Sequence, residues 1–165
     1  MTITRAARLQ LFAVMVGLIV LHFYLRPRLW DPRMTPDFLL LALMLYAMRS
    51  RPGQAAVAGL VVGLIVDAVT PARFGAAMLA HTIVGYLAAW GRAVFFADNL
   101  LVNVLFVAVG VWVRDLVLLL ASGVFGSQLT RELTIYAPVQ ALATGVAAFV
   151  VLFAFRDWFA IRLDV

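Results

Sequence analysis

Six long runs of apolar residues, separated by short breaks rich in Arg, Asp and Pro, occupy most of this chain. They cover residues 9–25, 36–48, 55–69, 74–90, 100–121 and 137–155. Strands of a membrane barrel alternate apolar and polar residues, which these runs do not. A helix satisfies its own backbone hydrogen bonds and can cross lipid singly, and each crossing takes about 20 apolar residues. The sequence therefore predicts an all-α, polytopic membrane protein, a bundle of about six transmembrane helices.

Composition leaves no room for a soluble domain beside this bundle. Of the 165 residues, 65% are hydrophobic and 13% are charged, whereas a water-soluble domain needs more polar surface to cover its core. The first apolar run superficially resembles a signal peptide, but residues 26–33 after it are charged and offer no small-residue cleavage site. We therefore expect a retained first span and one domain over residues 1–165.

Charge and motifs argue against most other function classes. All 13 basic residues are Arg, and they sit mainly at the ends of the apolar runs instead of forming the dense basic face of a nucleic-acid binder. There are no cysteines, both histidines are isolated, and no catalytic or nucleotide-binding motif occurs. We therefore expect no enzyme activity, no metal, no cofactor and no nucleic-acid partner, with membrane lipid as the surroundings.

The distribution of arginines gives an orientation. If the N-terminus is cytoplasmic, seven arginines flank the spans on the inside and five on the outside, which favours N-in and C-in. The inner set is Arg5, Arg8, Arg49, Arg51, Arg92, Arg156 and Arg162, and the outer set is Arg26, Arg28, Arg33, Arg73 and Arg131.

Small residues recur at every fourth position on two neighbouring predicted helices. One ridge is Ala55, Gly59, Gly63 and Asp67, and the other is Ala77, His81, Gly85 and Ala89. Residues four apart share a helix face, and small residues there let two helix backbones approach closely in lipid. Such patterns also arise by chance in spans rich in Ala and Gly, but two adjacent ridges favour close packing. The first span has a shorter version, Ala13 and Gly17.

Three ionisable positions inside the predicted spans stand out: Asp67, His81 and the neighbours Arg114 and Asp115. Such groups are costly in lipid and are normally paired. Asp67 ends its helix, where the macrodipole disfavours an anion, so we expect a cationic partner, either Arg114 or the local Arg73. Three alternatives stay open: Asp67 caps the following turn, His81 is a packing residue bonded to a backbone carbonyl, and one of Arg114 and Asp115 snorkels because sequence neighbours do not face each other.

One block of the sequence, residues 36–92, carries an ordered set of short motifs. They are Pro36 and Asp37 opening an apolar run, the polar turn from Arg49 to Gly53, Gly59 and Gly63 followed by Asp67, then Gly75, and finally Gly85 with Tyr86. In this order and spacing the block resembles the MreD family of bacterial rod-shape-determining membrane proteins. The resemblance covers about a third of the chain, and the rest agrees in hydropathy and length.

The resemblance implies a non-enzymatic scaffold in the bacterial cytoplasmic (inner) membrane. It would belong to the cell-elongation machinery and bind MreC, a bitopic protein, and through it RodA and penicillin-binding protein 2, in support of lateral peptidoglycan synthesis. It also implies a fold similar to the substrate-binding subunits of energy-coupling-factor transporters. An alternative is that the chain is itself such a vitamin-binding subunit, although its outer loops offer only Trp30, Gln128 and Tyr136 for a ligand. A proton-coupled transporter that uses Asp67 is a third reading, without a detectable inverted repeat.

Overall fold

The computed structural model describes residues 5–29, 31–95 and 99–155, and this part of the chain is all-helical. The main helices are α1 Arg5–Leu25, α2 Phe38–Ala47, α3 Pro52–Val69, α4 Ala76–Phe95, α5 Leu100–Ala121 and α7 Ala137–Ala154. Short elements join them: the 3-10 turns η1 Arg26–Arg28 and η2 Pro71–Arg73, the helix α6 Gly126–Arg131 and the π-helical segment η3 Glu132–Tyr136. Each of the six predicted helices is confirmed, with ends that differ by a few residues.

The region before α7 is helical instead of the predicted loop. α6, η3 and α7 follow one another without a break, so that one helical segment runs from Gly126 to Ala154 over 29 residues. A proline such as Pro138 ordinarily interrupts a helix, because it has no N–H to donate. The chain accommodates it through the π-helical turn just before it, where the N–H of Ala137 reaches back five residues to the carbonyl oxygen of Glu132.

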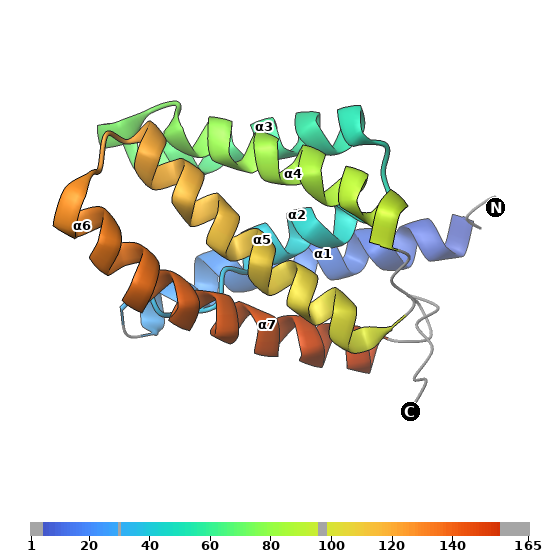
Figure 1. Cartoon of the computed structure of the whole chain (residues 1–165). Coiled ribbons are helices and arrows are strands. Elements are labelled where there is room, and N and C mark those ends of the chain that lie inside the picture. Colours follow the sequence, from blue (N-terminus) through green and yellow to red (C-terminus); the bar gives the residue numbers. More distant parts are fainter. Residues whose placement is uncertain (1–4, 30, 96–98, 156–165) are drawn as a thin grey trace.

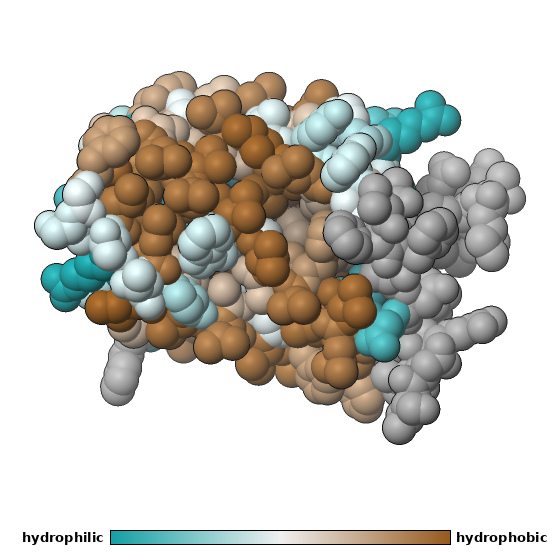
Figure 2. Space-filling view, viewed as in Figure 1, coloured by the Kyte–Doolittle hydropathy of each residue, from teal (hydrophilic) through white to brown (hydrophobic). Residues whose placement is uncertain are grey.

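Helix lengths and surface chemistry indicate a membrane protein. Within the described residues, three segments are long and apolar enough to cross a bilayer: Pro52–Val69, Leu100–Ala121 and Gly126–Ala154. Figure 2 shows apolar side chains over the middle of the visible face and polar ones toward its two ends. α2 differs from a full span, because its 10 residues rise only about 15 Å, half the thickness of the hydrocarbon core.

α2 is the centre of the bundle. It contacts α1, α3, α4, α5 and α7, and its side chains are buried on every side of the helix. The largest of them, at most 2% exposed, are Leu39, Leu40, Leu41, Leu43, Met44 and Leu45. A helix that is apolar all round is expected to be surrounded by other elements. α2 therefore acts as the core around which the longer helices pack.

α3 and α4 form the closest helix pair of the fold. A methyl group built on Gly59 would overlap the carbonyl oxygen of His81, one on Gly63 would overlap the backbone of Ala77, and one on Gly85 would press on the carbonyl of Ala55. The two ridges of small residues thus face each other backbone to backbone. Only glycine permits this approach at these positions, because any side chain needs the space that the partner backbone occupies.

Both ends of the described chain lie at one end of the bundle. Figure 1 shows that α1 begins and α7 ends there, together with the turn between α2 and α3. The turn between α3 and α4 lies at the opposite end, beside α6. We call this opposite end the α6 end. The polar residues described next gather there.

Candidate functional site

Asp37 lies at the centre of a buried polar cluster near the α6 end. It precedes the first residue of α2, and its Oδ1 accepts a hydrogen bond from the backbone N–H of Leu40 at 3.0 Å. This is N-capping, and Asp is among the residues best suited to it. The backbone N–H of Asp37 donates to Oγ1 of Thr144 on α7 at 3.0 Å. The residue is 3% exposed, so its charge needs a partner inside the protein.

Arg114 of α5 is that partner. Its Nη2 donates to Oδ2 of Asp37 at 2.8 Å and to Oε1 of Gln140 at 3.2 Å, and its Nη1 lies 3.1 Å from Oδ1 of Asp115. The side chain is 7% exposed. Charge-assisted hydrogen bonds of this kind are the strong ones in a low-dielectric interior. One guanidinium thus ties α5 to the start of α2 and to α7.

α1 and the segment before α2 complete the cluster. Nδ1 of His22 accepts from the N–H of Leu39 at 3.2 Å and lies 3.4 Å from Oδ1 of Asp37. Arg26 lies 3.8 Å from Oδ2 of Asp37 through Nη1 and donates from Nη2 to the carbonyl oxygen of Pro32 at 3.0 Å. The positive charge facing Asp37 therefore comes from Arg114 on α5 and from Arg26 on η1, the turn that follows α1, and this ties the end of α1 to the start of α2.

Gln140 joins the segment before α2 to α7. Its Nε2 donates to the carbonyl oxygens of Pro32 and Thr35, each at 3.2 Å, while its Oε1 accepts from Arg114. These carbonyls lie outside regular helix, and a side-chain donor satisfies them where water is scarce. The cluster of His22, Arg26, Asp37, Arg114, Asp115, Gln140 and Thr144, which we call the Asp37 cluster, connects α1, α2, α5 and α7.

The predicted pair between Asp67 and Arg114 is wrong. The carboxylate of Asp67 instead accepts the backbone N–H groups of Gly75 at 2.9 Å, Ala77 at 3.2 Å and Met78 at 3.0 Å. These groups belong to the start of α4, whose positive dipole end takes the place of the expected cation. Asp67 therefore caps α4, the next main helix. This is close to the alternative in which Asp67 caps the turn that follows α3.

The other polar residues expected in the spans also have defined places. His81 is buried with Nδ1 2.8 Å from the carbonyl oxygen of Ala77, as expected of a packing histidine. Arg114 and Asp115 do contact each other, contrary to the expectation for sequence neighbours. The arginine side chain is long enough to fold back over the adjacent carboxylate even though the two Cβ atoms diverge.

The motif residues of the block from 36 to 92 mostly have structural roles. Asp37 caps α2, and Gly75, with φ +98°, adopts a left-handed conformation that lets its N–H reach Asp67. Gly85 lies in the helix seam, whereas Tyr86 is 48% exposed on the outer surface. Asp37 was expected only to open a span. Its position directly before an apolar run is the N-cap signal that points to its role.

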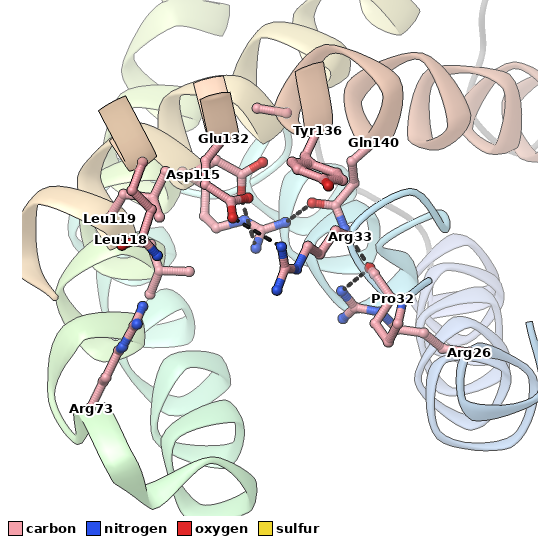
Figure 3. Close-up of a pocket in the computed structure, with 13 residues that line it drawn as sticks. Arg26, Pro32, Arg33, Arg73, Asp115, Leu118, Leu119, Glu132, Tyr136 and Gln140 are labelled. Carbon is pink, nitrogen blue, oxygen red and sulfur yellow. Dashed lines mark hydrogen bonds and ion pairs between the residues drawn. The ribbon is translucent and has the colours of Figure 1, made fainter. Parts of the chain in front are cut away.

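Two neighbouring cavities adjoin the Asp37 cluster. One of about 280 Å³ is drawn in Figure 3, which shows Arg73 extending toward Leu118 and Leu119 from the α3–α4 turn. The other, of about 450 Å³, is lined by residues of α1, α2, α3, α4 and α5 and of the turns beside them. Arg26 and Arg114 line both cavities. In the described part of the chain, no group of three or more His, Cys, Asp or Glu is arranged to hold a metal ion.

Comparison with known proteins identifies the family. The family model described as rod shape-determining protein MreD matches residues 5–161, nearly the whole chain and well beyond the block that carries the sequence resemblance. Searches of curated proteins and of solved structures give no match. The chain therefore belongs to the MreD family of rod shape-determining proteins.

Proposed function

We propose that this protein is a non-enzymatic scaffold of the cell-elongation machinery. In this role it binds a bitopic MreC-like partner in the cytoplasmic membrane and, through it, supports lateral peptidoglycan synthesis by RodA and penicillin-binding protein 2. Membership of the MreD family implies a role in rod-shape determination. The polar residues of the Asp37 cluster hold helices together, which also favours a structural function.

One structural observation supports a helix-docking role. α1 packs on α2 through its buried face, which includes Val14 and Leu18. Ala13 and Gly17 lie on an exposed part of α1, and a methyl group built on Gly17 meets nothing within 4 Å. Because small residues let a second helix backbone approach closely in lipid, this face suits one membrane helix of a bitopic partner.

The arginines of the first outer loop are mostly engaged within the protein, so they contribute little to docking. Arg26 is turned into the bundle toward Asp37, and Arg28 lies over the ring of Tyr24 at 3.9 Å from its centroid. Arg33 pairs with Glu132 at 3.1 Å. We therefore assign the main partner contact to the exposed face of α1.

The proposed topology is multi-pass with both termini in the cytoplasm. α1 begins and α7 ends at the same end of the bundle, together with the turn that carries Arg49 and Arg51, which supports this orientation (Figure 1). Arg156 and Arg162, which also contribute to the predicted charge bias, lie outside the described residues.

Bulky substitutions on the exposed face of α1 test the scaffold function. Ala13→Leu and Gly17→Leu should abolish co-purification of the bitopic partner and rod shape, while the protein remains folded and in the membrane. Gly53→Leu is the matched control, because a methyl group at Gly53 also meets nothing within 4 Å, but on α3. Normal partner recovery with both α1 variants would exclude this face as the docking site.

The vitamin-binding alternative makes a different prediction. It requires saturable binding of a vitamin by the purified chain, with thermal stabilisation that depends on ligand concentration. The comparisons with known proteins give this alternative no support. Trp30, one of the residues considered for such a site, lies outside the described residues.

A further inference from the structure

The larger cavity at the α6 end has the size of a ligand site. Its volume is about 450 Å³, within the usual range for small-molecule pockets. It shares Arg26, Pro32, Arg114 and Leu118 with the smaller cavity of Figure 3, so the two meet at a pair of arginines. The hydrogen bonds of the Asp37 cluster explain how the helices are held together, but they do not explain the cavity beside them.

The two arginines have hydrogen-bond donors to spare. A guanidinium carries five N–H donors, and those of Arg114 engage Asp37, Asp115 and Gln140. Among the described residues, the buried Nε atoms of Arg114 and Arg26 have no acceptor. Leaving a buried donor unpaired is costly, and it is costlier when the group is charged. The arrangement therefore has room for an acceptor that carries negative charge.

A third buried nitrogen points to a further polar group on the ligand. His81 lines the same cavity, and within the described part its Nε2 has no hydrogen-bond partner. Nδ1 donates to the carbonyl oxygen of Ala77, so Nε2 of the neutral ring is an acceptor. A hydroxyl group near the anion would satisfy it. An alcohol-bearing phosphate head group offers both features.

The mouth of the cavity points to a lipid. Phe23 of α1 and Val69 of α3 both line it, and they are 47% and 68% exposed on the outside of the bundle. In a membrane, large apolar side chains with that exposure face hydrocarbon. The cavity thus combines a cationic interior with an apolar opening toward the bilayer, which matches an anionic head group attached to acyl chains.

We propose that this cavity binds the phosphate head group of one anionic membrane phospholipid. Arg26 and Arg114 donate to the phosphate, Arg73 adds positive charge from the adjoining cavity, and the acyl chains leave between Phe23 and Val69. This site goes beyond the scaffold function, and it requires only that the chain is inserted in a membrane.

Binding to purified full-length protein in mild detergent tests the proposal. Native mass spectrometry counts retained lipid, and thermal unfolding is followed during titration with phosphatidylglycerol, phosphatidylcholine or inorganic phosphate. Arg26→Gln removes a head-group donor, and Arg28→Gln is its control on the same turn, outside both cavities. Val69→Trp fills the mouth, and Val57→Trp is its control, an exposed valine nearer the start of α3.

We expect wild type and both controls to retain one phosphatidylglycerol. Arg26→Gln and Val69→Trp should each bind it about tenfold more weakly, the effect of losing one charge-assisted hydrogen bond or a comparable apolar contact. If Arg26→Gln fails to fold, Val69→Trp still tests whether the cavity binds lipid, because a change to an exposed side chain should leave the fold intact.

Three results would overturn the proposal: equal binding by all the variants, equal binding of phosphatidylcholine, or equal stabilisation by inorganic phosphate, which would indicate a soluble anion. Recovery of the bitopic partner is scored separately in the same variants. If a variant loses lipid but still recovers the partner, the scaffold function is unaffected by that result. If a variant loses the partner but still binds lipid, the lipid site is unaffected.

Discussion

Nη2 of Arg114 on α5 lies 2.8 Å from Oδ2 of Asp37 at the start of α2, although the two residues are 77 positions apart in the sequence. Both side chains are more than nine-tenths buried. The pair joins a long helix of the bundle to the short central one. It also lies where the two cavities meet, so it belongs both to the packing of the fold and to the proposed lipid site.

This pair predicts a strong energetic coupling. Asp37→Asn keeps the capping oxygen but removes the charge, and Arg114→Gln removes its partner. Each single change should destabilise the protein by about 3–5 kcal/mol, because a buried charge is left alone, and the double variant should cost less than the sum. Thermal unfolding in detergent measures all three. Strictly additive losses would show that the two charges do not depend on each other.

Asp67 should behave independently of Arg114. Its carboxylate accepts three backbone N–H groups from the start of α4, and an Asn side chain has one oxygen in place of two. Asp67→Asn should therefore cost about 1–3 kcal/mol through loss of capping. Combined with Arg114→Gln, its effect on the unfolding free energy should be additive. A large coupling in this double-mutant cycle would instead show that Asp67 and Arg114 interact directly.

The difference between the expected and observed partners of Asp67 shows what the sequence can reveal. The order and approximate bounds of the six main helices were predictable, because continuous apolar runs directly reflect helices in lipid, whereas the helical residues 126–136 before α7 were not. The partner of Asp67 was not, because its positive charge belongs to backbone N–H groups at a helix start, which have no side-chain signature. Charge pairing alone therefore led to Arg114.

The buried position of Asp37 could not be predicted from the sequence for a related reason. At the start of an apolar run it resembles a residue at the membrane surface, where a carboxylate needs no partner. The structure buries it because α2 is short and lies inside the bundle, so that its first turn sits beside α5 and α7. The length of residues 36–48 was the available clue, since 13 residues are too few for a full span.

The seam between α3 and α4 should tolerate almost no added volume. Gly63→Ala places a methyl group against the backbone of Ala77 and Met78, which cannot move aside as a side chain can. We expect a loss of about 1–3 kcal/mol from overpacking, and more for Gly63→Leu. Val61→Leu is the control on the exposed surface of the same helix, because Val61 is 52% exposed. Similar unfolding temperatures for the seam and control variants would show that the two backbones are not in contact.

The absence of native cysteines makes the proposed topology directly testable, since any labelled thiol is an introduced one. Ser127→Cys lies on α6, which the topology places outside, and Ser127 is exposed. Thr4→Cys and Asp164→Cys lie in the terminal segments outside the described residues, which the topology places in the cytoplasm. A membrane-impermeant maleimide added to intact cells should label Ser127→Cys alone, and all three should react after the membrane is permeabilised. Labelling of either terminal cysteine in intact cells would require an odd number of crossings or the inverted orientation, and the arginine bias would then have no topological meaning.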